Sequence, residues 1–226
     1  MVEFNRFFSR CAGWLVLAVL LALAGCATPP KPYDYTAFKA AKPASLLVLP
    51  PLNETPDVTA SLGVLSQMTL PLSEAGYYVL PVSLVNETLH QNGVTDPHDA
   101  QAIPREKLRS IFGADAAVYI LVKKYGASYQ VVSSNLTVEV EAKVVDLRSG
   151  ELLWHGRAMA SSAEQNGGGQ GGLVGLLVKA IVEQIANNLS DTRNLQFADI
   201  AAKRLFFPNG VNGILYGPRS PNYSKN

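Results

Sequence analysis

The chain has 226 residues, a length that suits one domain with a substantial hydrophobic core. Hydrophobic residues make up 48% of the sequence, which excludes an intrinsically disordered protein. The 19 basic and 18 acidic residues nearly balance, so the composition offers no electrostatic basis for binding nucleic acid.

Residues 1–25 have the layout of a secretory signal peptide. Arg6 and Arg10 form a positive amino-terminal region, and the apolar run that follows at 11–24 is too short for a membrane-spanning helix. A signal peptide is therefore favoured over a membrane anchor. Its removal also takes away Glu3, so the remaining chain has no formal net charge.

The segment Leu23-Ala24-Gly25-Cys26 resembles the lipobox of bacterial lipoproteins. The resemblance implies that diacylglycerol is attached to the sulfur of Cys26 and that the chain is cut before it. Cys11 leaves with the signal, so neither a disulfide nor a free thiol remains. Apart from this covalent lipid on Cys26, the sequence predicts no cofactor. The alternative is an ordinary signal peptide or an uncleaved anchor that contains a cysteine by chance.

Residues 26–43 are rich in proline and lysine without a sustained period, and they predict a lipidated tether. The residue after Cys26 is Ala27 rather than aspartate. By resemblance to the sorting rule of enteric bacteria, Ala27 favours the outer membrane over the inner one. The sequence leaves open whether the domain faces the periplasm or the cell surface.

Residues 44–192 predict a single compact α/β (α+β) domain, a mixed sheet of about five strands with helices packed on it. Its first part alternates strands and helices, in the order of a parallel crossover. The expected elements are a buried strand at 45–51, a helix at 62–76 with a kink at Pro71, a strand at 77–82, and helices at 83–91 and 104–112 joined by a loop.

The stretch 116–160 predicts an antiparallel meander of three strands. Within its second strand, Leu136, Val138 and Val140 point one way, whereas Glu139 and Glu141 point the other. This alternation indicates a sheet with one packed face and one solvated face.

Glycine-rich residues then precede a helix predicted at 173–189. Gly167, Gly169 and Gly172 have the spacing of a dinucleotide-binding loop. No second parallel strand follows, and no acidic residue ends a strand to hold a ribose, so a partner-binding loop is favoured. Residues 173–182 are apolar nearly all round, which indicates either a homo-oligomer or burial beneath the sheet.

Residues 193–226 predict a carboxyl-terminal extension with a hairpin at 204–218. Its aromatic side chains must cover either this domain or a partner. Phe206, Phe207 and Tyr216 are therefore candidate partner-binding residues, together with the glycine-rich loop.

No pattern of catalytic or metal-ligating residues stands out. Asp96, His98 and Asp99 are explained better by a turn that caps a helix than by a metal site. Glu139 and Glu141 are paired carboxylates, but a solvated strand face explains them better than catalysis. The sequence therefore predicts neither an enzyme nor a metal ion.

Three segments carry a resemblance to known families. The turn signature "VVDLRSGELLWHGRA" is similar to that of CsgG-type periplasmic domains and TolB amino-terminal-like domains. The whole chain, including "EAGYYVLPVSLVNE" and "DIAAKRLFFPNGVNGILYGP", resembles a bacterial lipoprotein family of unknown function, the Neisseria surface-antigen lipoprotein type. The resemblance implies a compact α/β domain associated with an envelope transport or assembly system. The chain lacks the long amphipathic hairpins of the export-pore members.

The predicted function is that of a non-catalytic, lipid-anchored periplasmic protein that binds proteins of an envelope transport or secretion/assembly system. Its expected partners are the membrane, through the lipid anchor, and envelope proteins such as a CsgG-like lipoprotein or transporter subunits. The alternative is an outer-membrane lipoprotein that regulates a peptidoglycan synthase. A tether of about 17 residues reaches at most roughly 60 Å, which is marginal for crossing the periplasm to such an enzyme.

Overall fold

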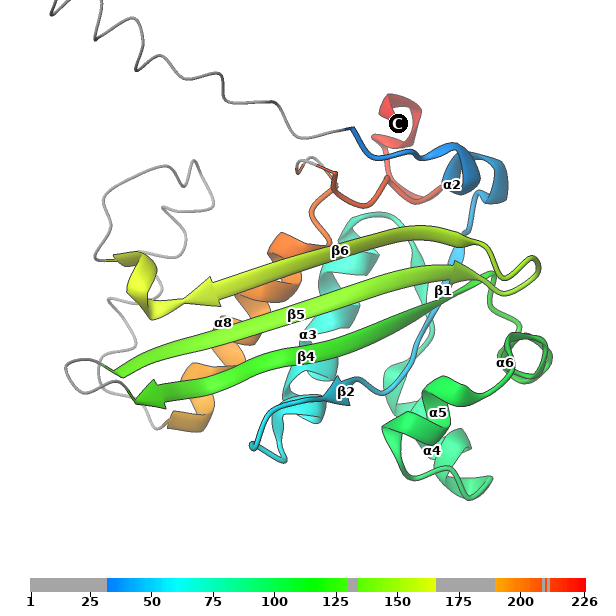
Figure 1. Cartoon of the computed structure of the whole chain (residues 1–226). Helices are drawn as coiled ribbons and strands as arrows, with labels where there is room; N and C mark the ends of the chain where they lie inside the picture. Colours follow the sequence, from blue (N-terminus) through cyan, green and yellow to red (C-terminus); the bar gives the residue numbers. More distant parts are fainter. Residues whose placement is uncertain (1–31, 130–133, 166–189, 209, 211) are drawn as a thin grey trace, which may run out of the picture. The chain divides into compact units, whose positions relative to one another are not determined.

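One mixed sheet of six strands forms the centre of the fold, in the order β3-β1-β4-β5-β6, with β2 paired to β4. This confirms the predicted α/β class. The computed structural model describes residues 32–129, 134–165, 190–208, 210 and 212–226 (Figure 1). The strands are β1 (Ser45–Val48), β2 (Leu52–Asn53), β3 (Tyr78–Val79), β4 (Ala116–Tyr129), β5 (Ser134–Asp146) and β6 (Leu152–Ser161).

Helices connect and cover the strands. The α-helices are α2 (Thr36–Ala41), α3 (Ala60–Glu74), α4 (Val82–Gln91), α5 (Pro97–Ala102), α6 (Arg105–Phe112) and α8 (Ser190–Leu205). Two short 3₁₀ helices are η1 (Ser162–Gln165) and η2 (Tyr223–Lys225). The predicted kink does not end α3, which continues through Pro71 to Glu74.

The first half of the sheet is parallel, as the predicted crossover requires. Strand β1 pairs with β3 on one side and with β4 on the other, in both cases in parallel. Pro50 and Pro51 have no N–H to donate, and β1 ends just before them. The chain then returns as β2, which pairs in parallel with β4.

The second half of the sheet is the predicted antiparallel meander of β4, β5 and β6. Its register brings residues of three strands into rows across one face. A β-bulge between Val122 and Lys124 interrupts the ladder of β4 with β5. At the bulge Val122 lies opposite Val140, whereas Lys124 lies opposite Glu139, so Lys123 is the additional residue.

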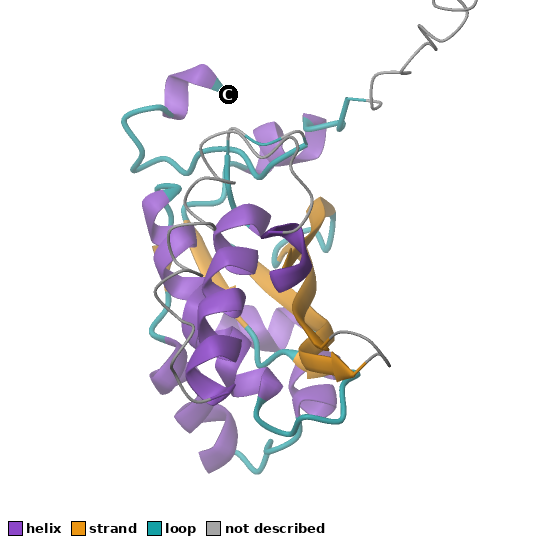
Figure 2. Cartoon of the chain, turned by 90° about the vertical axis from the view of Figure 1, so that its left-hand side faces the viewer, coloured by secondary structure: helices purple, strands orange, loops and turns teal. Residues whose placement is uncertain are grey.

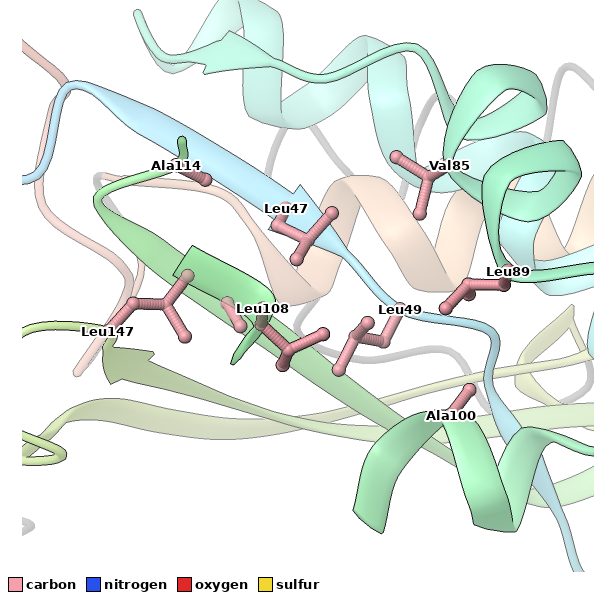
Figure 3. Packing of buried hydrophobic residues seen from close by; sticks show 9 residues of the cluster. Leu47, Leu49, Val85, Leu89, Ala100, Leu108, Ala114 and Leu147 are labelled. Atoms are coloured by element: carbon pink, nitrogen blue, oxygen red, sulfur yellow. The ribbon is translucent and has the colours of Figure 1, made fainter. Parts of the chain in front are cut away.

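Helices cover the two faces of the sheet unequally. On one face α3 and α8 pack along the long strands, as Figures 1 and 2 show. On the other face, α4, α5 and α6 pack only around β1 and the start of β4, where they bury Leu47 and Leu49 against Val85 and Leu89 of α4 (Figure 3). No described helix covers the remaining face of β4, β5 and β6, which agrees with the alternation in the sequence.

Three segments differ from the predictions. The expected loop before residue 104 contains α5, whose first turn is capped by the Asp96 carboxylate. The predicted hairpin at 204–218 is wrong, because α8 continues to Leu205 and the described residues after it form no strand. The end of the predicted tether forms α2, and its Phe38 is only 3% exposed. The sequence pattern did not indicate α5 or α2.

The burial of Phe38 makes α2 part of the folded domain. Replacing this ring with alanine removes buried apolar surface and leaves a cavity, so Phe38→Ala should lower the free energy of unfolding by about 3 kcal/mol. Urea denaturation of both proteins measures the difference. The neighbouring Lys39→Ala, at an exposed position of the same helix, should change it by less than about 0.5 kcal/mol. Equal effects of the two substitutions would contradict the packing of α2.

Candidate functional site

Five of the predicted functional residues lie outside the described part of the chain. These are the lipidation residue, the sorting residue and the three glycines of the loop: Cys26, Ala27, Gly167, Gly169 and Gly172. The helix predicted at 173–189 also lies outside it. Their roles stay predictions.

The three aromatic candidates of the tail, residues 206–226, have different surroundings. Phe206 is buried within this domain, with its ring 5.9 Å from that of Trp154. Its predicted role in binding a partner is therefore wrong, because the domain itself covers it. Phe207 is 45% exposed, and Tyr216 lies in a groove beside α2.

The tail is held on the domain by hydrogen bonds to its backbone. The indole Nε1–H of Trp154 donates to the backbone carbonyl of Asn212 over 3.0 Å. The hydroxyl of Tyr77 donates to the backbone carbonyl of Leu215 over 2.5 Å. Burial raises the pKa of the Tyr77 phenol, with a smaller contribution from Tyr223, so the phenol remains a donor. The backbone N–H of Gly217 donates to the carbonyl oxygen of Ala75 over 2.8 Å.

The tail and α2 form a groove of about 250 Å³, which we call the α2–tail groove. Figure 1 shows the tail passing β6 and ending beside α2. The groove has aromatic and aliphatic walls and two lysines. Its described lining residues include Phe38, Lys39, Lys42, Pro43, Tyr216 and Tyr223.

A second surface, the open sheet face, consists of three rows of side chains across β4, β5 and β6. The register sets these rows as Tyr119 with Lys143 and His155, Leu121 with Glu141 and Arg157, and Lys124 with Glu139 and Met159. The Lys143 ammonium lies 4.9 Å from the centre of the Tyr119 ring. Met159 is 44% exposed. The face therefore combines apolar side chains with charges of both signs.

Glu139 is the buried centre of this face. Its side chain is 2% exposed, with Oε2 2.9 Å from the ammonium of Lys124 and Oε1 paired to the Arg157 guanidinium. Burial alone would raise the pKa of the Glu139 carboxyl, but the pairing with Lys124 and Arg157 outweighs burial and lowers it. The predicted solvated position of Glu139 is therefore wrong, because its two cations cover it.

The β-bulge explains how Glu139 obtains both partners. Val122 and Tyr125 are buried on the helix-covered side, and two successive lysines lie between them. Strict alternation would send Lys123 and Lys124 to opposite faces. The additional residue allows Lys124 to reach Glu139 while Lys123 pairs with Glu54. In the sequence, the two consecutive lysines were the one indication of a bulge, and they do not establish it by themselves.

The described residues offer little for catalysis or metal binding. Within these parts of the chain, no three His, Cys, Asp or Glu side chains are grouped so that they could hold a metal ion. Asp96 accepts a hydrogen bond from the backbone N–H of His98 over 2.6 Å, which is a capping role. Glu139 is held in ion pairs. None of the described helices has the length and apolar character needed to cross a membrane.

Comparisons with known proteins define the class and then the family. A family model described as "Putative lipoprotein GNA1162-like" matches residues 33–219. A Neisseria meningitidis serogroup B protein, described as "Putative lipoprotein NMB1124/NMB1162", is 51% identical over 206 residues, 91% of this chain and 94% of that protein. The class is that of lipoproteins, which are anchored to a membrane of the cell envelope. The chain belongs to the GNA1162-like lipoprotein family.

Two solved structures show how far the likeness extends. The crystal structure of lipoprotein GNA1162 from Neisseria meningitidis is similar, with 50% identity and a TM-score of 0.51, over 65% of this chain and 100% of that one. The carboxyl-terminal domain of LpoB from Escherichia coli has 16% identity and a TM-score of 0.38, over 53% of this chain and 84% of that one. The first supports the fold described above. The likeness to CsgG-type and TolB-type domains stays a prediction.

The buried carboxylate predicts a pH-dependent contribution to stability. The pKa of Glu139 is lower in the folded protein than in the unfolded chain, where a glutamate titrates near pH 4.3, about its ordinary value. Its contribution is therefore present above about pH 4.3 and lost as the pH falls through the folded pKa. Glu139→Gln should lower the free energy of unfolding at pH 7 by about 1–2 kcal/mol and weaken its acid dependence.

Urea denaturation of the wild type and the variant over a pH series measures this difference. Glu141→Gln is the matched control, because Glu141 lies in the adjacent row and is 39% exposed. It should leave the pH profile nearly parallel to that of the wild type. A Glu139→Gln profile that also runs parallel would show that the ion pairs add no stability.

Proposed function

We propose that this lipoprotein is a non-catalytic, protein-binding component of an envelope transport or secretion/assembly system, anchored to the outer membrane by lipid on Cys26. Membership of a lipoprotein family, whose description names no reaction, supports a lipid-anchored, non-catalytic protein. The open sheet face supports the protein-binding role. It presents three rows of side chains that no described helix covers.

The geometry of this face suits recognition of a protein. Its charged groups are held in place before a partner arrives, since Glu139 fixes Lys124 and Arg157. Preorganised charges of both signs favour a partner with the complementary pattern and disfavour other proteins. The exposed side chain of Met159 adds an adaptable apolar contact.

The anchor itself is tested by replacing each cysteine of the sequence. In bacteria fed a labelled fatty acid, wild-type protein and Cys11→Ser should carry the label, whereas Cys26→Ser should not. Gel electrophoresis with fluorescence detection measures the label, and mass spectrometry of the amino terminus identifies the site of cleavage. Label retained by Cys26→Ser would contradict the proposed attachment site.

The protein-binding face is tested by a photo-crosslinking residue in place of Met159 in the full-length chain in cells. We expect adducts with an envelope transporter or export-pore subunit, identified by mass spectrometry. The additional change Glu141→Arg reverses one charge of the face and should lower their yield by roughly tenfold.

The matched control places the same crosslinker at Glu74, an exposed residue at the end of α3. Adducts of equal yield from positions 159 and 74 would contradict the open sheet face as the interface. Capture of a peptidoglycan synthase from position 159 would instead support the alternative function. The described fold begins near α2, so the ten residues from Cys26 to Tyr35 reach at most about 35 Å, which weakens this alternative.

A further inference from the structure

The α2–tail groove carries two lysines that pair with no described acidic side chain. Lys39 and Lys42 are both exposed, and neither forms an ion pair with any described residue. No aspartate or glutamate is among the described residues that line the groove. Lys123 and Lys124 of β4, in contrast, are paired with Glu54 and Glu139. The groove therefore suits an anionic ligand.

Aromatic residues complete the groove, and the backbone of one of them, Tyr216, is held in place. Tyr216 and Tyr223 line it together with the buried Phe38. The backbone of Tyr216 is fixed twice by Asn226, since its N–H donates to Oδ1 over 2.9 Å and its carbonyl accepts from Nδ2 over 3.0 Å. Tyrosine rings with an apolar body and a polar tip favour the boundary between water and hydrocarbon.

The position of the groove in the chain brings it close to the proposed anchor. Helix α2, which forms one wall, begins at Thr36. The ten residues from Cys26 to Tyr35 span at most about 35 Å in any conformation. If Cys26 carries the lipid, as proposed above, the membrane surface is always within this distance of α2. A ligand in that membrane is thus present at a high effective concentration.

From these observations we propose that the α2–tail groove binds the phosphate headgroup of an anionic phospholipid in the leaflet that holds the anchor. The ammonium groups of Lys39 and Lys42 pair with the phosphate, and the tyrosines contact the headgroup region. The proposal rests on the lipid anchor of the proposed function. It adds a second attachment, which would set which side of the domain faces the membrane.

The test uses the full acylated chain with a photo-crosslinking residue in place of Tyr216. The protein is reconstituted in vesicles of phosphatidylcholine alone, or of phosphatidylcholine mixed with phosphatidylglycerol. Mass spectrometry then measures adducts with lipid. We expect adducts mainly in the vesicles that contain phosphatidylglycerol, and a fall of about tenfold when Lys39 and Lys42 are both changed to glutamine. Changing both to arginine keeps the charge and should retain the adducts.

Two controls separate the groove from charge and proximity in general. Lys107→Gln with Arg109→Gln removes two exposed cations from α6 and should leave the adducts at position 216 unchanged. A crosslinker at Gln91, at the end of α4 and on the opposite side of the fold from α2, should give few adducts (Figure 1). Circular dichroism confirms that each variant is folded.

The outcomes distinguish this inference from the proposal on which it rests. Flotation of the chain with vesicles at high salt reports the acyl anchor, because exposed charges are then screened. A chain that floats but gives equal adducts from positions 216 and 91, or adducts that do not depend on phosphatidylglycerol, overturns the groove site alone. A chain that fails to float at high salt lacks the anchor, which overturns both proposals.

Discussion

Over most of their length, the long antiparallel strands β4, β5 and β6 are covered by described helices on only one face, and this unequal cover determines much of the structure. The covered face takes buried valines such as Val122, Val138 and Val140. The other face must remain compatible with water, yet its central carboxylate, Glu139, is itself buried by its neighbours. Ion pairs with Lys124 and Arg157 resolve this conflict, because the side chains of both cations remain exposed. Paired side chains thereby surround the carboxylate where no described helix lies over it.

Much of the fold could be predicted from periodicity. Alternation in β5 and the apolar run of β4 indicated the meander, and apolar residues at helical spacing indicated α3. Proline and glycine then marked most boundaries. The tail has the sequence pattern of a hairpin, because its two aromatic stretches flank residues typical of turns. Their burial comes instead from contacts with a distant strand, such as that of Phe206 with Trp154, which a local pattern cannot show.

The candidate surfaces were less visible in the sequence. Polar residues that alternate along a strand predict a solvated face. Only the strand register shows that Glu139 lies between two cations. The α2–tail groove joins residues near 40 to residues beyond 214, so no spacing rule applies to it. Proline and lysine made the segment before β1 look like a plain tether. The single ring of Phe38 shows instead that the fold begins there.

The β-bulge also has a consequence for how this strand tolerates changes in length. In a regular strand, losing or gaining one residue turns every later side chain over to the opposite face. At the bulge, Lys123 is already additional to the ladder, and the residues on both sides of it keep their partners on β5. Loss of one lysine there would restore a regular ladder without inverting the core. The bulge is therefore a site where β4 can lose one residue and keep its core face.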